Sequence, residues 1–520
     1  MKYSFIQLND LPDEILLIIL KNFHNVEVLD SLIGVNKRLN IIAHDSIFTN
    51  HLTLYFLDNC ISPLPDPILD RFCLQILPEI HYKIKWLNLE STSMERILLA
   101  TNYPNLYGLG LYGIDVEKAL SLFNASKKFF EHLQPYYHSV SCQKLYENDY
   151  DEFKHALALL SDLKDLPSIS DQKYNITKEQ CSIYRSERFN QKFHNEDTNI
   201  NRQFPLAFSI LMYENVEQFE RLLRLIYRPQ NFYCVHVDND APANVLQAVK
   251  SIVQCFDNVI LASKQEKVLY ATFSRLQADL NCMYDLIRYP SWRYLLNIAN
   301  TELPLKTNSE LVKILSIYRG YNDIEGRWKS KNKDRTEYVW QIIDTPEGDN
   351  KQVPQLRRTN EKKTPPPGNV EIVKGSAYGA FSRAFIEFVQ TSPIAKELLD
   401  WSRDAYSPDE HYWATLNYNT HLHTPGGYKA KTDPTNWTAR FVNWGEQNCY
   451  GRIIRGICVF GIIDLPILLN RHELFANKFH LNADPIAYQC LEELILNKSK
   501  LDLPLNDAIY YRQMPFLLPS

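Results

Sequence analysis

The chain has 520 residues, of which 45% are hydrophobic and 22% charged, and its formal net charge is −5 at pH 7. This length predicts two or three domains, and the composition is that of a soluble globular protein. The slightly acidic balance gives no electrostatic basis for nucleic acid as a main partner. The apolar runs at 15–20 and 453–469 are too short or are interrupted by charge, so no transmembrane helix is expected. Acidic residues near the start also leave no room for a signal-peptide core.

The first fifty residues predict short helices. An amphipathic run over residues 8–23 contains LPDEIL, and a second helix carries VNKRL at residues 35–39. Together the two motifs resemble an F-box, a short helical module that docks onto an adaptor of ubiquitin-ligase complexes; an ordinary helical hairpin is the alternative. The resemblance implies an F-box-like domain over residues 5–50, with a ubiquitin-ligase adaptor as its partner.

A small internal repeat follows. I-x-x-L-x-L at residues 84–89 recurs as L-x-x-L-x-L at residues 106–111, a period of 22 residues. This pattern is typical of leucine-rich repeats, in which alternate leucines line a short strand. Two repeats are too few to fold alone, so a leucine-rich-repeat-like segment over residues 51–126 should pack against a neighbouring part of the chain. With the F-box-like segment it predicts a binding module, not an enzyme.

From residue 204 onward the pattern becomes that of an α/β fold. Residues 205–212 (PLAFSILM) predict a buried strand, residues 216–227 a helix, and residues 232–237 (FYCVHV) a second strand that ends at Asp238. A polar residue at the carboxyl end of such a strand is how an open α/β sheet builds a nucleotide crevice. Many unrelated folds share this arrangement, so it does not define a function by itself.

The segment YSPDEHYWATL, residues 406–416, carries the strongest functional signal. Ser407, Pro408 and Glu410 fit a helix start, with Ser407 as N-cap and Glu410 as the acid of a capping box. The segment also resembles the one carrying the catalytic glutamate in the core 2-type β-1,6-N-acetylglucosaminyltransferases (glycosyltransferase family 14), which branch O-glycans. The resemblance covers about residues 140–500 and includes RPQNFYCVHVD, LYATFSRLQADLNCMYDL and TELPLKTNSELV. It implies a GT-A-type, Rossmann-like nucleotide-sugar transferase domain.

The resemblance also implies a pocket for the donor UDP-GlcNAc. The residues expected to line it are Leu211, Met212, Tyr213, Asp238, Asn239, Asp240 and Tyr270. Asp238-Asn239-Asp240 could instead be a DxD metal site, because paired carboxylates with diphosphate oxygens hold Mg²⁺ or Mn²⁺ well. The family works without metal, so no metal cofactor is expected. Its matching segment does not normally carry the second aspartate, so Asp240 keeps the metal alternative open.

A metal-free transferase must still neutralise the leaving diphosphate. Arg455, in RGICVFG, and Lys478, in LFANKF, match the two basic residues that do this in the family. Arginine offers a planar fork to phosphate oxygens and lysine a compact charge. Fixed cations aimed at charge that grows in the transition state lower the barrier. The alternative for either residue is a solvated surface cation.

The reaction that the resemblance implies is a single inverting displacement. Glu410 would take the proton from the C6 hydroxyl of the acceptor sugar as that oxygen attacks C1 of GlcNAc, opposite UDP. One carboxylate suffices as general base if it lies within hydrogen-bond reach of the hydroxyl. No covalent glycosyl-enzyme, and therefore no second carboxylate nucleophile, is needed.

Acceptor-binding positions match the family less closely. Glu325, Lys333, Arg335 and Trp444 correspond to residues that contact the acceptor galactose and GalNAc, but Arg335 does so only with a one-residue deletion. These departures affect the identity of the O-glycan acceptor more than the reaction. The basic, proline-rich stretch 351–369 predicts a solvated loop.

Eight of the ten cysteines lie beyond residue 140, and their spacing alone leaves the pairing open. Buried free thiols would be expected in a cytosolic protein. The family resemblance implies the four disulfides Cys142–Cys490, Cys181–Cys255, Cys234–Cys282 and Cys449–Cys458. Four such pairs indicate a domain shaped in an oxidising lumen. No His/Cys cluster has zinc spacing, so a structural metal is not expected.

The two parts of the sequence predict different compartments. A disulfide-bonded UDP-GlcNAc transferase belongs in the Golgi lumen or membrane, whereas an F-box module acts in the cytosol. The leading hypothesis is an enzyme that moves GlcNAc in β-1,6 linkage onto O-glycans. The alternative is an F-box substrate receptor whose carboxyl-terminal domain binds glycans without turning them over. A related xylosyl-transferring enzyme fits the SPDEHYWATL segment and the cysteines less well.

Overall fold

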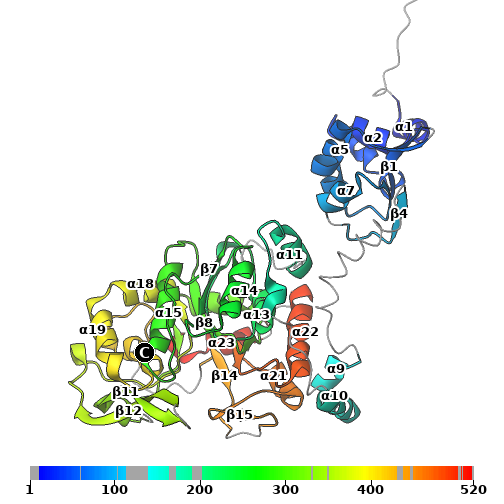
Figure 1. Ribbon diagram of the computed structural model, residues 1–520. Coiled ribbons are helices and arrows are strands. Elements are labelled where there is room, and N and C mark those ends of the chain that lie inside the picture. Colours follow the sequence, from blue (N-terminus) through cyan, green and yellow to red (C-terminus); the bar gives the residue numbers. More distant parts are fainter. Residues whose placement is uncertain are drawn as a thin grey trace, which may run out of the picture. The chain divides into compact units, whose positions relative to one another are not determined.

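The computed structural model describes residues 11–58, 60–101, 103–112, 139–162, 171–189, 202–329, 332–347, 351–429, 437–445, 449–501, 505 and 507–517. The chain divides into two compact units, Met1–Leu133 and Gln134–Ser520, which are treated separately below (Figure 1). No helix among the described residues combines the length and the apolar character needed to cross a bilayer.

The amino-terminal unit begins with short helices packed on one another. Its helices are α1 (Asp13–Leu20), α2 (Asn25–Leu32), α3 (Lys37–Ala43), α4 (Ser46–Thr49), α5 (Asp66–Arg71), α6 (Leu77–Ile80) and α7 (Met94–Ala100), with a π-helical turn at Phe72–Ile76. α1 and α3 overlap the two predicted motifs, whereas α2 was not predicted. Residues 8–10 of the predicted first helix lie outside the described residues. Leu16, Leu29 and Phe48 are fully buried, so one apolar core joins these helices.

A four-stranded sheet completes this unit, in the order β2-β1-β3-β4. The strands are β1 (His51–Asp58), β2 (Cys60–Pro63), β3 (Trp86–Glu90) and β4 (Gly108–Tyr112). β1, β3 and β4 run parallel, and Leu87 and Leu89 of β3 lie opposite Leu109 and Leu111 of β4. The predicted repeat therefore forms neighbouring strands in register.

The carboxyl-terminal unit is built on a six-stranded sheet in the order β10-β13-β8-β5-β6-β7. The strands are β5 (Leu206–Met212), β6 (Phe232–Val237), β7 (Val259–Leu261), β8 (Tyr294–Ala299), β10 (Asp323–Ile324) and β13 (Gly379–Ser382). β8, β5, β6 and β7 run parallel, and β13 is antiparallel to both of its neighbours, β8 and β10. Every residue of β5 is buried, including Ser209, as its mainly apolar sequence predicted. This mixed α/β sheet agrees with the expected GT-A-type domain.

Helices cover both faces of this sheet. They include α13 (Val216–Ile226), α14 (Ala243–Val253), α15 (Phe273–Leu286), α16 (Asn308–Tyr318), α18 (Arg383–Thr391), α19 (Pro393–Trp401), α20 (Tyr412–Tyr418) and α22 (Pro485–Leu501). The strand order reverses after β7, because β8 returns to the other side of β5. Right-handed crossovers therefore place α13 and α14 on one face and α15 on the other (Figure 1). The crevice at such a reversal is the usual ligand site of open α/β sheets.

Shorter elements complete the unit. They are the helices α9 (Cys142–Tyr146), α10 (Tyr150–Asp162), α11 (Cys181–Arg188), α17 (Asp334–Glu337), α21 (Leu465–Leu469) and α23 (Ala508–Arg512), the sheet of β14 (Arg440–Val442), β17 (Phe475–Asn477) and β9 (Glu302–Pro304), and the pair β15 (Ile453–Ile454) and β16 (Ile457–Cys458). β17 lies between β14 and β9 and delivers residue 478 directly after its last residue.

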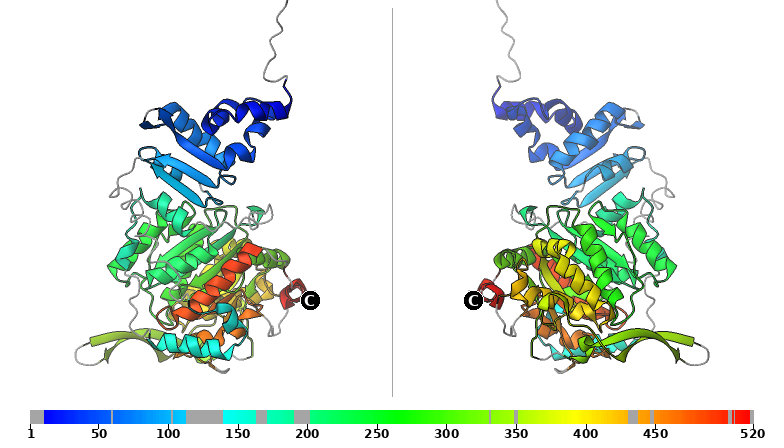
Figure 2. Two further views of the ribbon diagram at one scale, coloured as in Figure 1. Left: turned by 90° about the vertical axis from the view of Figure 1, so that its right-hand side faces the viewer. Right: turned by 90° about the vertical axis from the view of Figure 1, so that its left-hand side faces the viewer.

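The predicted solvated loop at 351–369 is wrong over most of its length. Residues Lys351–Lys362 form β12, which pairs antiparallel with β11 (Tyr338–Glu347) in a long two-stranded ribbon (Figure 2). Pro354 lies within β12, opposite Asp344. A two-stranded ribbon has only edge strands, where an outward-facing proline costs no ladder hydrogen bond. The proline content therefore misled the prediction.

All four expected disulfides are present in the carboxyl-terminal unit. Their Cα–Cα separations are 5.1 Å for Cys142–Cys490, 4.9 Å for Cys181–Cys255, 5.4 Å for Cys234–Cys282 and 5.7 Å for Cys449–Cys458. These values lie within the range of native disulfides. Cys73, in the amino-terminal unit, is a free thiol.

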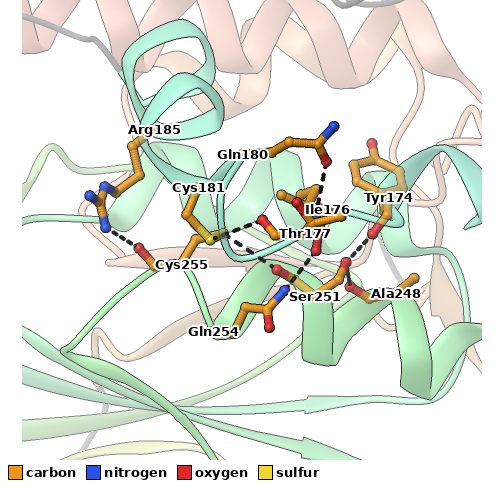
Figure 3. Close-up of a disulfide and its surroundings, with 10 residues drawn as sticks. All are labelled: Tyr174, Ile176, Thr177, Gln180, Cys181, Arg185, Ala248, Ser251, Gln254 and Cys255. Carbon is orange, nitrogen blue, oxygen red and sulfur yellow. Dashed lines mark hydrogen bonds between the residues drawn. A yellow bond between two sulfur atoms is a disulfide. The ribbon is translucent and has the colours of Figure 1, made fainter.

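The Cys181–Cys255 disulfide shows how an outlying segment is fastened to the sheet domain (Figure 3). It joins α11 to the residues that follow α14. Arg185 donates to the carbonyl of Cys255 at 2.6 Å, and the Gln254 amide donates to the carbonyl of Ile176 at 2.6 Å. Backbone contacts therefore accompany the covalent link, and the segment carrying α11 is held against α14.

Candidate active site

The carboxyl ends of β5 and β6 bring most of the predicted donor residues together. Leu211 and Met212 end β5 and are almost fully buried, whereas the next side chain, Tyr213, is 48% exposed. The backbone NH of Asp238 donates to the carbonyl of Met212 at 2.9 Å, so the two segments lie side by side. Of the three predicted donor residues at the end of β5, Tyr213 is therefore the one whose side chain is exposed to a ligand in the crevice.

Asp238 acts on the backbone of the loop that leads to Tyr270. One carboxylate oxygen accepts the NH of Asp240 at 2.9 Å, and the other accepts the NH of Val268 at 3.2 Å. Burial raises the pKa of Asp238, and these two hydrogen bonds oppose that shift. Asp240 forms an ion pair with Lys267 at 2.9 Å. Both aspartates are therefore engaged in contacts within the protein.

The residues that the structure describes contain no group of three or more His, Cys, Asp or Glu side chains arranged to hold a metal ion. Of the two predicted diphosphate-binding residues, Arg455 contacts another predicted donor residue. The guanidinium of Arg455 lies 4.8 Å from the ring centroid of Tyr270, a cation–π contact. Tyr270 is itself 63% exposed. The structure thus brings Arg455 and Tyr270 together, although they lie far apart in the sequence.

Lys478 follows β17 and belongs to the same group. Burial lowers the pKa of its ammonium, and the nearby charge of Arg455 lowers it further. Two like charges held close together, one of them desolvated, raise the free energy of the site. An anion bound between them would remove that cost. This arrangement is the strongest electrostatic argument for a phosphate site.

The segment that contains Glu410 does not form the predicted capping box. Ser407 has φ +45° and makes no side-chain capping hydrogen bond, and Pro408–Glu410 form one 3₁₀ turn before α20. The backbone NH of Ser407 donates to the carbonyl of Ala271 at 2.7 Å, next to Tyr270. The NH of Ser407 is thus bonded to Ala271 and not to the Glu410 carboxylate, as a capping box would require. The helix-capping alternative for Glu410 is therefore wrong.

Glu410 is held by two cations. Arg335 donates to its Oε2 at 2.5 Å, and the ammonium of Lys374 lies 3.6 Å from the same oxygen. The Arg335 guanidinium also stacks on the ring of Tyr406, 4.8 Å from its centroid. Arg335, Lys374, Ser407 and Glu410 line one small cleft. The carboxylate is thus fixed in orientation but remains partly open to solvent, with 27% of the side chain exposed.

Tyr406 connects the Glu410 cleft with the donor side. Burial raises the pKa of Tyr406, and its contact with Tyr270 contributes to the shift. Tyr270 and Tyr406 share a cavity of about 260 Å³ with Ile342, Gln355 and Leu356 of the β11–β12 ribbon. A series of contacts therefore runs from Glu410 through Arg335 and the two tyrosines to Arg455.

The other residues of the motif support it from within. His411 is buried and bonds Ser402 at 3.0 Å, and burial lowers the pKa of its imidazole to about 3. Trp413 is fully buried against Phe381. Asp409 is also buried, and desolvation raises the pKa of its carboxyl to about 6 despite the charge of Arg275. Glu410 is the acid of this motif that faces the cleft.

The predicted acceptor residues are brought together only in part. Glu325 forms an ion pair with Arg327 at 2.7 Å, Lys333 is exposed just before α17, and Trp444 is 53% exposed. Among the described residues, no hydrogen bond or ion pair joins Lys333 or Trp444 to Glu410. Arg335, in contrast, contacts Glu410 directly.

Sequence reasoning missed Lys374, Tyr406 and Asp409. Lys374 precedes β13 in an irregular stretch with no periodicity, and nothing local indicates its proximity to Glu410. Tyr406 is the first residue of the YSPDEHYWATL segment, so its place beside Glu410 in the sequence could have indicated a role in the site. Asp409 lies within the predicted helix start, and the sequence gives no sign that its carboxyl is buried.

An α/β sheet with its crevice at the reversal of strand order, two basic residues beside an exposed tyrosine, and a fixed carboxylate together define a nucleotide-sugar transferase. The Core-2/I-branching enzyme family matches residues 206–468. The chain is 38% identical over 379 residues to "Beta-1,3-galactosyl-O-glycosyl-glycoprotein beta-1,6-N-acetylglucosaminyltransferase 3" of Rattus norvegicus, covering 69% of this chain and 84% of the relative.

Similar relatives occur elsewhere. The Homo sapiens protein of the same description is 38% identical over 378 residues, which cover 69% of this chain and 84% of the relative. A Bovine herpesvirus 4 protein, "Beta-1,3-galactosyl-O-glycosyl-glycoprotein beta-1,6-N-acetylglucosaminyltransferase", is also 38% identical over 378 residues, with 83% of it covered. The chain belongs to the Core-2/I-branching enzyme family. The prediction of a core 2-type branching glycosyltransferase is therefore confirmed, and the non-catalytic alternative is not favoured.

Proposed function

We propose that this enzyme transfers GlcNAc from UDP-GlcNAc, in β-1,6 linkage and with inversion, to a GalNAc or galactose residue of an O-glycan. The observation that carries the proposal is the pair of groups on one surface: the fixed carboxylate of Glu410 and the cations Arg455 and Lys478. The relatives are described as enzymes that add GlcNAc in β-1,6 linkage to a β-1,3-galactosyl-O-glycosyl glycoprotein.

Glu410 acts as the general base. Arg335 and Lys374 both contact Oε2, so Oε1 is the oxygen left to accept a proton. As the acceptor O6 forms its bond to C1 of GlcNAc, its proton passes to Glu410 and the bond from C1 to the UDP oxygen breaks. A positioned carboxylate in this role contributes about 10²–10⁴-fold to the rate.

Arg455 and Lys478 stabilise the departing UDP, whose negative charge grows as the bond to C1 breaks. Tyr270 lies beside Arg455 and lines the donor, and Leu211, Met212, Tyr213 and the Asp238–Asp240 turn surround its uridine and ribose. Because Asp238 and Asp240 are engaged with the backbone and with Lys267, the proposal includes no metal ion. Glu325, Lys333, Arg335 and Trp444 contact the acceptor, and of these four residues Arg335 also contacts the base.

Turnover is expected to resist removal of divalent metal. The purified full chain, from a secretory host, should release UDP from UDP-GlcNAc with a Gal-β1,3-GalNAc acceptor at the same rate in EDTA as in Mn²⁺. Product linkage analysis should show a β-1,6 bond. Turnover lost in EDTA would make Asp238 and Asp240 metal ligands. No turnover with any GalNAc- or galactose-terminated acceptor would refute the proposed reaction.

Lys478 gives a second test, through pH. Lys478→Ala should lower kcat/KM by about 10²–10³-fold, the usual loss for a group that stabilises transition-state charge. Because burial lowers the pKa of this lysine, its charge is lost at a lower pH than that of an ordinary lysine. Activity should fall as pH rises through that pKa, and Lys478→Arg should move this alkaline limit upward. Lys396→Ala, at an exposed position, should change neither kcat/KM nor the alkaline pH at which activity falls. If that pH is the same in Lys478→Arg as in the wild type, the loss of activity comes from another group.

The amino-terminal unit is proposed to be an F-box-like and leucine-rich-repeat-like binding module, over residues 5–50 and 51–126, that docks a ubiquitin-ligase adaptor. The overlap of α1 and α3 with the two helical motifs and the register of β3 and β4 support this. The four disulfides would persist in the oxidising lumen of the Golgi, and this is the compartment proposed for the catalytic domain, residues 140–500. Adaptor docking would apply only to chain in the cytosol.

A further inference from the structure

Gln218, in the first turn of α13, is a buried amide that binds three backbone groups from two other segments. Its side chain is 2% exposed. Nε2 donates to the carbonyls of Asn300, at 2.8 Å, and Phe479, at 3.1 Å, and Oε1 accepts the NH of Leu481 at 2.9 Å. A side-chain amide has two donor hydrogens, and both are used here.

Two of these three contacts are to Phe479 and Leu481, in the segment directly after Lys478. The NH of Phe479 also donates to the carbonyl of Thr301 at 2.7 Å, and the carbonyl of Lys478 accepts the NH of Phe460 at 2.9 Å. Lys478 is thus held through its own backbone on one side and through the Gln218 amide on the other. These anchors fix the backbone from which the Lys478 side chain extends, and so the region that its ammonium can reach.

The third contact leads to the donor crevice. The Asn300 amide donates to the carbonyls of Glu214, at 2.8 Å, and Asn215, at 3.2 Å, directly after Tyr213. Asn215 caps α13 by accepting the NH of Gln218 at 2.9 Å. Gln218 and Asn300 therefore join the segment carrying Tyr213 to the segment carrying Lys478.

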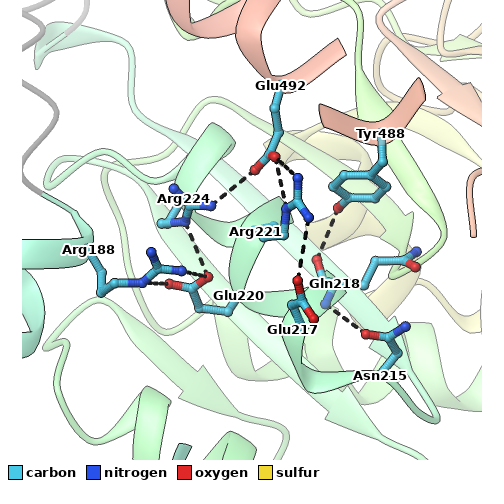
Figure 4. Close-up of polar contacts among 9 residues, drawn as sticks. All are labelled: Arg188, Asn215, Glu217, Gln218, Glu220, Arg221, Arg224, Tyr488 and Glu492. Atoms are coloured by element: carbon cyan, nitrogen blue, oxygen red, sulfur yellow. Dashed lines mark hydrogen bonds and ion pairs between the residues drawn. The ribbon is translucent and has the colours of Figure 1, made fainter. Parts of the chain in front are cut away.

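The helix that carries Gln218, α13, is held in place by its neighbours. Figure 4 shows the cluster of charged residues that ties it to α11 and α22. Glu220 pairs with Arg188 at 2.7 Å, and both Arg221 and Arg224 pair with Glu492 of α22. The hydroxyl of Tyr488 donates to the carbonyl of Gln218 at 3.1 Å. Contacts from the two neighbouring helices α11 and α22 thus fix the position of α13 and of the Gln218 backbone.

We propose that Gln218 is a positioning residue that sets the Lys478 ammonium against the diphosphate of the donor and keeps it in register with the nucleoside end of the crevice. Gln218 touches neither the donor nor the acceptor. The inference rests on the proposed role of Lys478 in binding the diphosphate. It predicts that loss of the amide weakens recognition of phosphate without weakening recognition of the nucleoside.

The test compares UDP with uridine as ligands of the full chain, by calorimetry or competition binding. Gln218→Met keeps the length of the side chain and its helix propensity but removes all three hydrogen bonds. It should weaken UDP binding about tenfold, the effect of losing one to two well-made hydrogen bonds, and should change uridine binding less than twofold. A structural role alone would weaken both ligands equally, and that result would overturn the proposal, as would unchanged UDP binding.

A matched control and a double-mutant cycle complete the design. Gln254→Met removes a comparable amide-to-carbonyl hydrogen bond, to Ile176, away from the site (Figure 3), and should leave both ligands unaffected. In a Lys478→Ala background, Gln218→Met should have no further effect on UDP. If Lys478→Ala itself leaves UDP binding unchanged, the proposed role of Lys478 fails instead. Should Gln218→Met not fold, Gln218→Asn, whose shorter amide cannot reach all three partners, is compared in the same way.

Discussion

Glu410→Gln is expected to lower kcat by about 10²–10⁴-fold while leaving the affinity for UDP within twofold of the wild type. The amide cannot accept the proton of the acceptor hydroxyl, so the general-base contribution is lost. UDP binding depends on other residues, Arg455 and Lys478. Initial rates with saturating donor and acceptor give kcat, and calorimetry gives the UDP dissociation constant.

Glu397→Gln is the control for this variant, because it makes the same charge change at an exposed position on α19. It should turn over at the wild-type rate. Glu410→Gln also faces Arg335 and Lys374 without its negative charge, so its fold should be checked by near-ultraviolet circular dichroism. A folded Glu410→Gln variant with a kcat within fivefold of the wild type would mean that another group takes the proton.

Sequence predicted the parts of the fold that rest on unbroken local patterns. β5 and β6 are mainly apolar runs, each with one polar residue (Ser209 and His236), and such strands are buried in the middle of a sheet. The β3–β4 register followed from a fixed period of leucines. The disulfide pairing came from family resemblance, since spacing alone left it open.

The parts that sequence did not predict depend on contacts between distant segments. Ser407 adopts a left-handed conformation because its NH bonds Ala271, and no local pattern encodes that. Lys374 reaches Glu410 through a long-range approach of two irregular segments. The β12 strand was missed because Pro354 signals a loop, whereas its pairing with β11 decides its structure. Gln218 lies on a recognisable helix, but its three partners are backbone groups that only the folded chain brings near.

A buried ion pair beside the strand that leads to Lys478 should contribute strongly to the stability of the catalytic unit. Arg440 and Glu302 form an ion pair at 2.8 Å, and both side chains are 0% exposed. Arg440 also donates to the carbonyls of Asn297 and Ala439, and the amide of Asn477, next to Lys478, donates to Glu302 at 3.1 Å. Burial raises the pKa of the Glu302 carboxyl, and Arg440 is the main group opposing that shift. Without the arginine, the buried carboxylate would keep hydrogen bonds to the Asn477 amide and to the backbone at Ala299 but would lose its paired charge.

Arg440→Met is therefore expected to lower the free energy of unfolding of the catalytic unit by about 3–5 kcal/mol, the cost of leaving a buried charge without its partner. Urea titrations followed by tryptophan fluorescence measure it. With the arginine gone, the pKa of Glu302 in the folded state lies still further above its value in the unfolded state, and these two pKa values define a pH interval. Stability should then fall as pH rises through that interval, so the loss should be larger at pH 8 than at pH 5.

Two further variants separate the lost ion pair from lost packing. Arg403→Met breaks an exposed ion pair with Asp400 and should cost no more than about 1 kcal/mol. Adding Glu302→Gln to Arg440→Met removes the uncompensated charge, so the double variant should regain stability and lose its pH dependence. A double variant as unstable as Arg440→Met at both pH values would mean that the packing of the Arg440 side chain, and not its charge, holds β14 to β9 and β17.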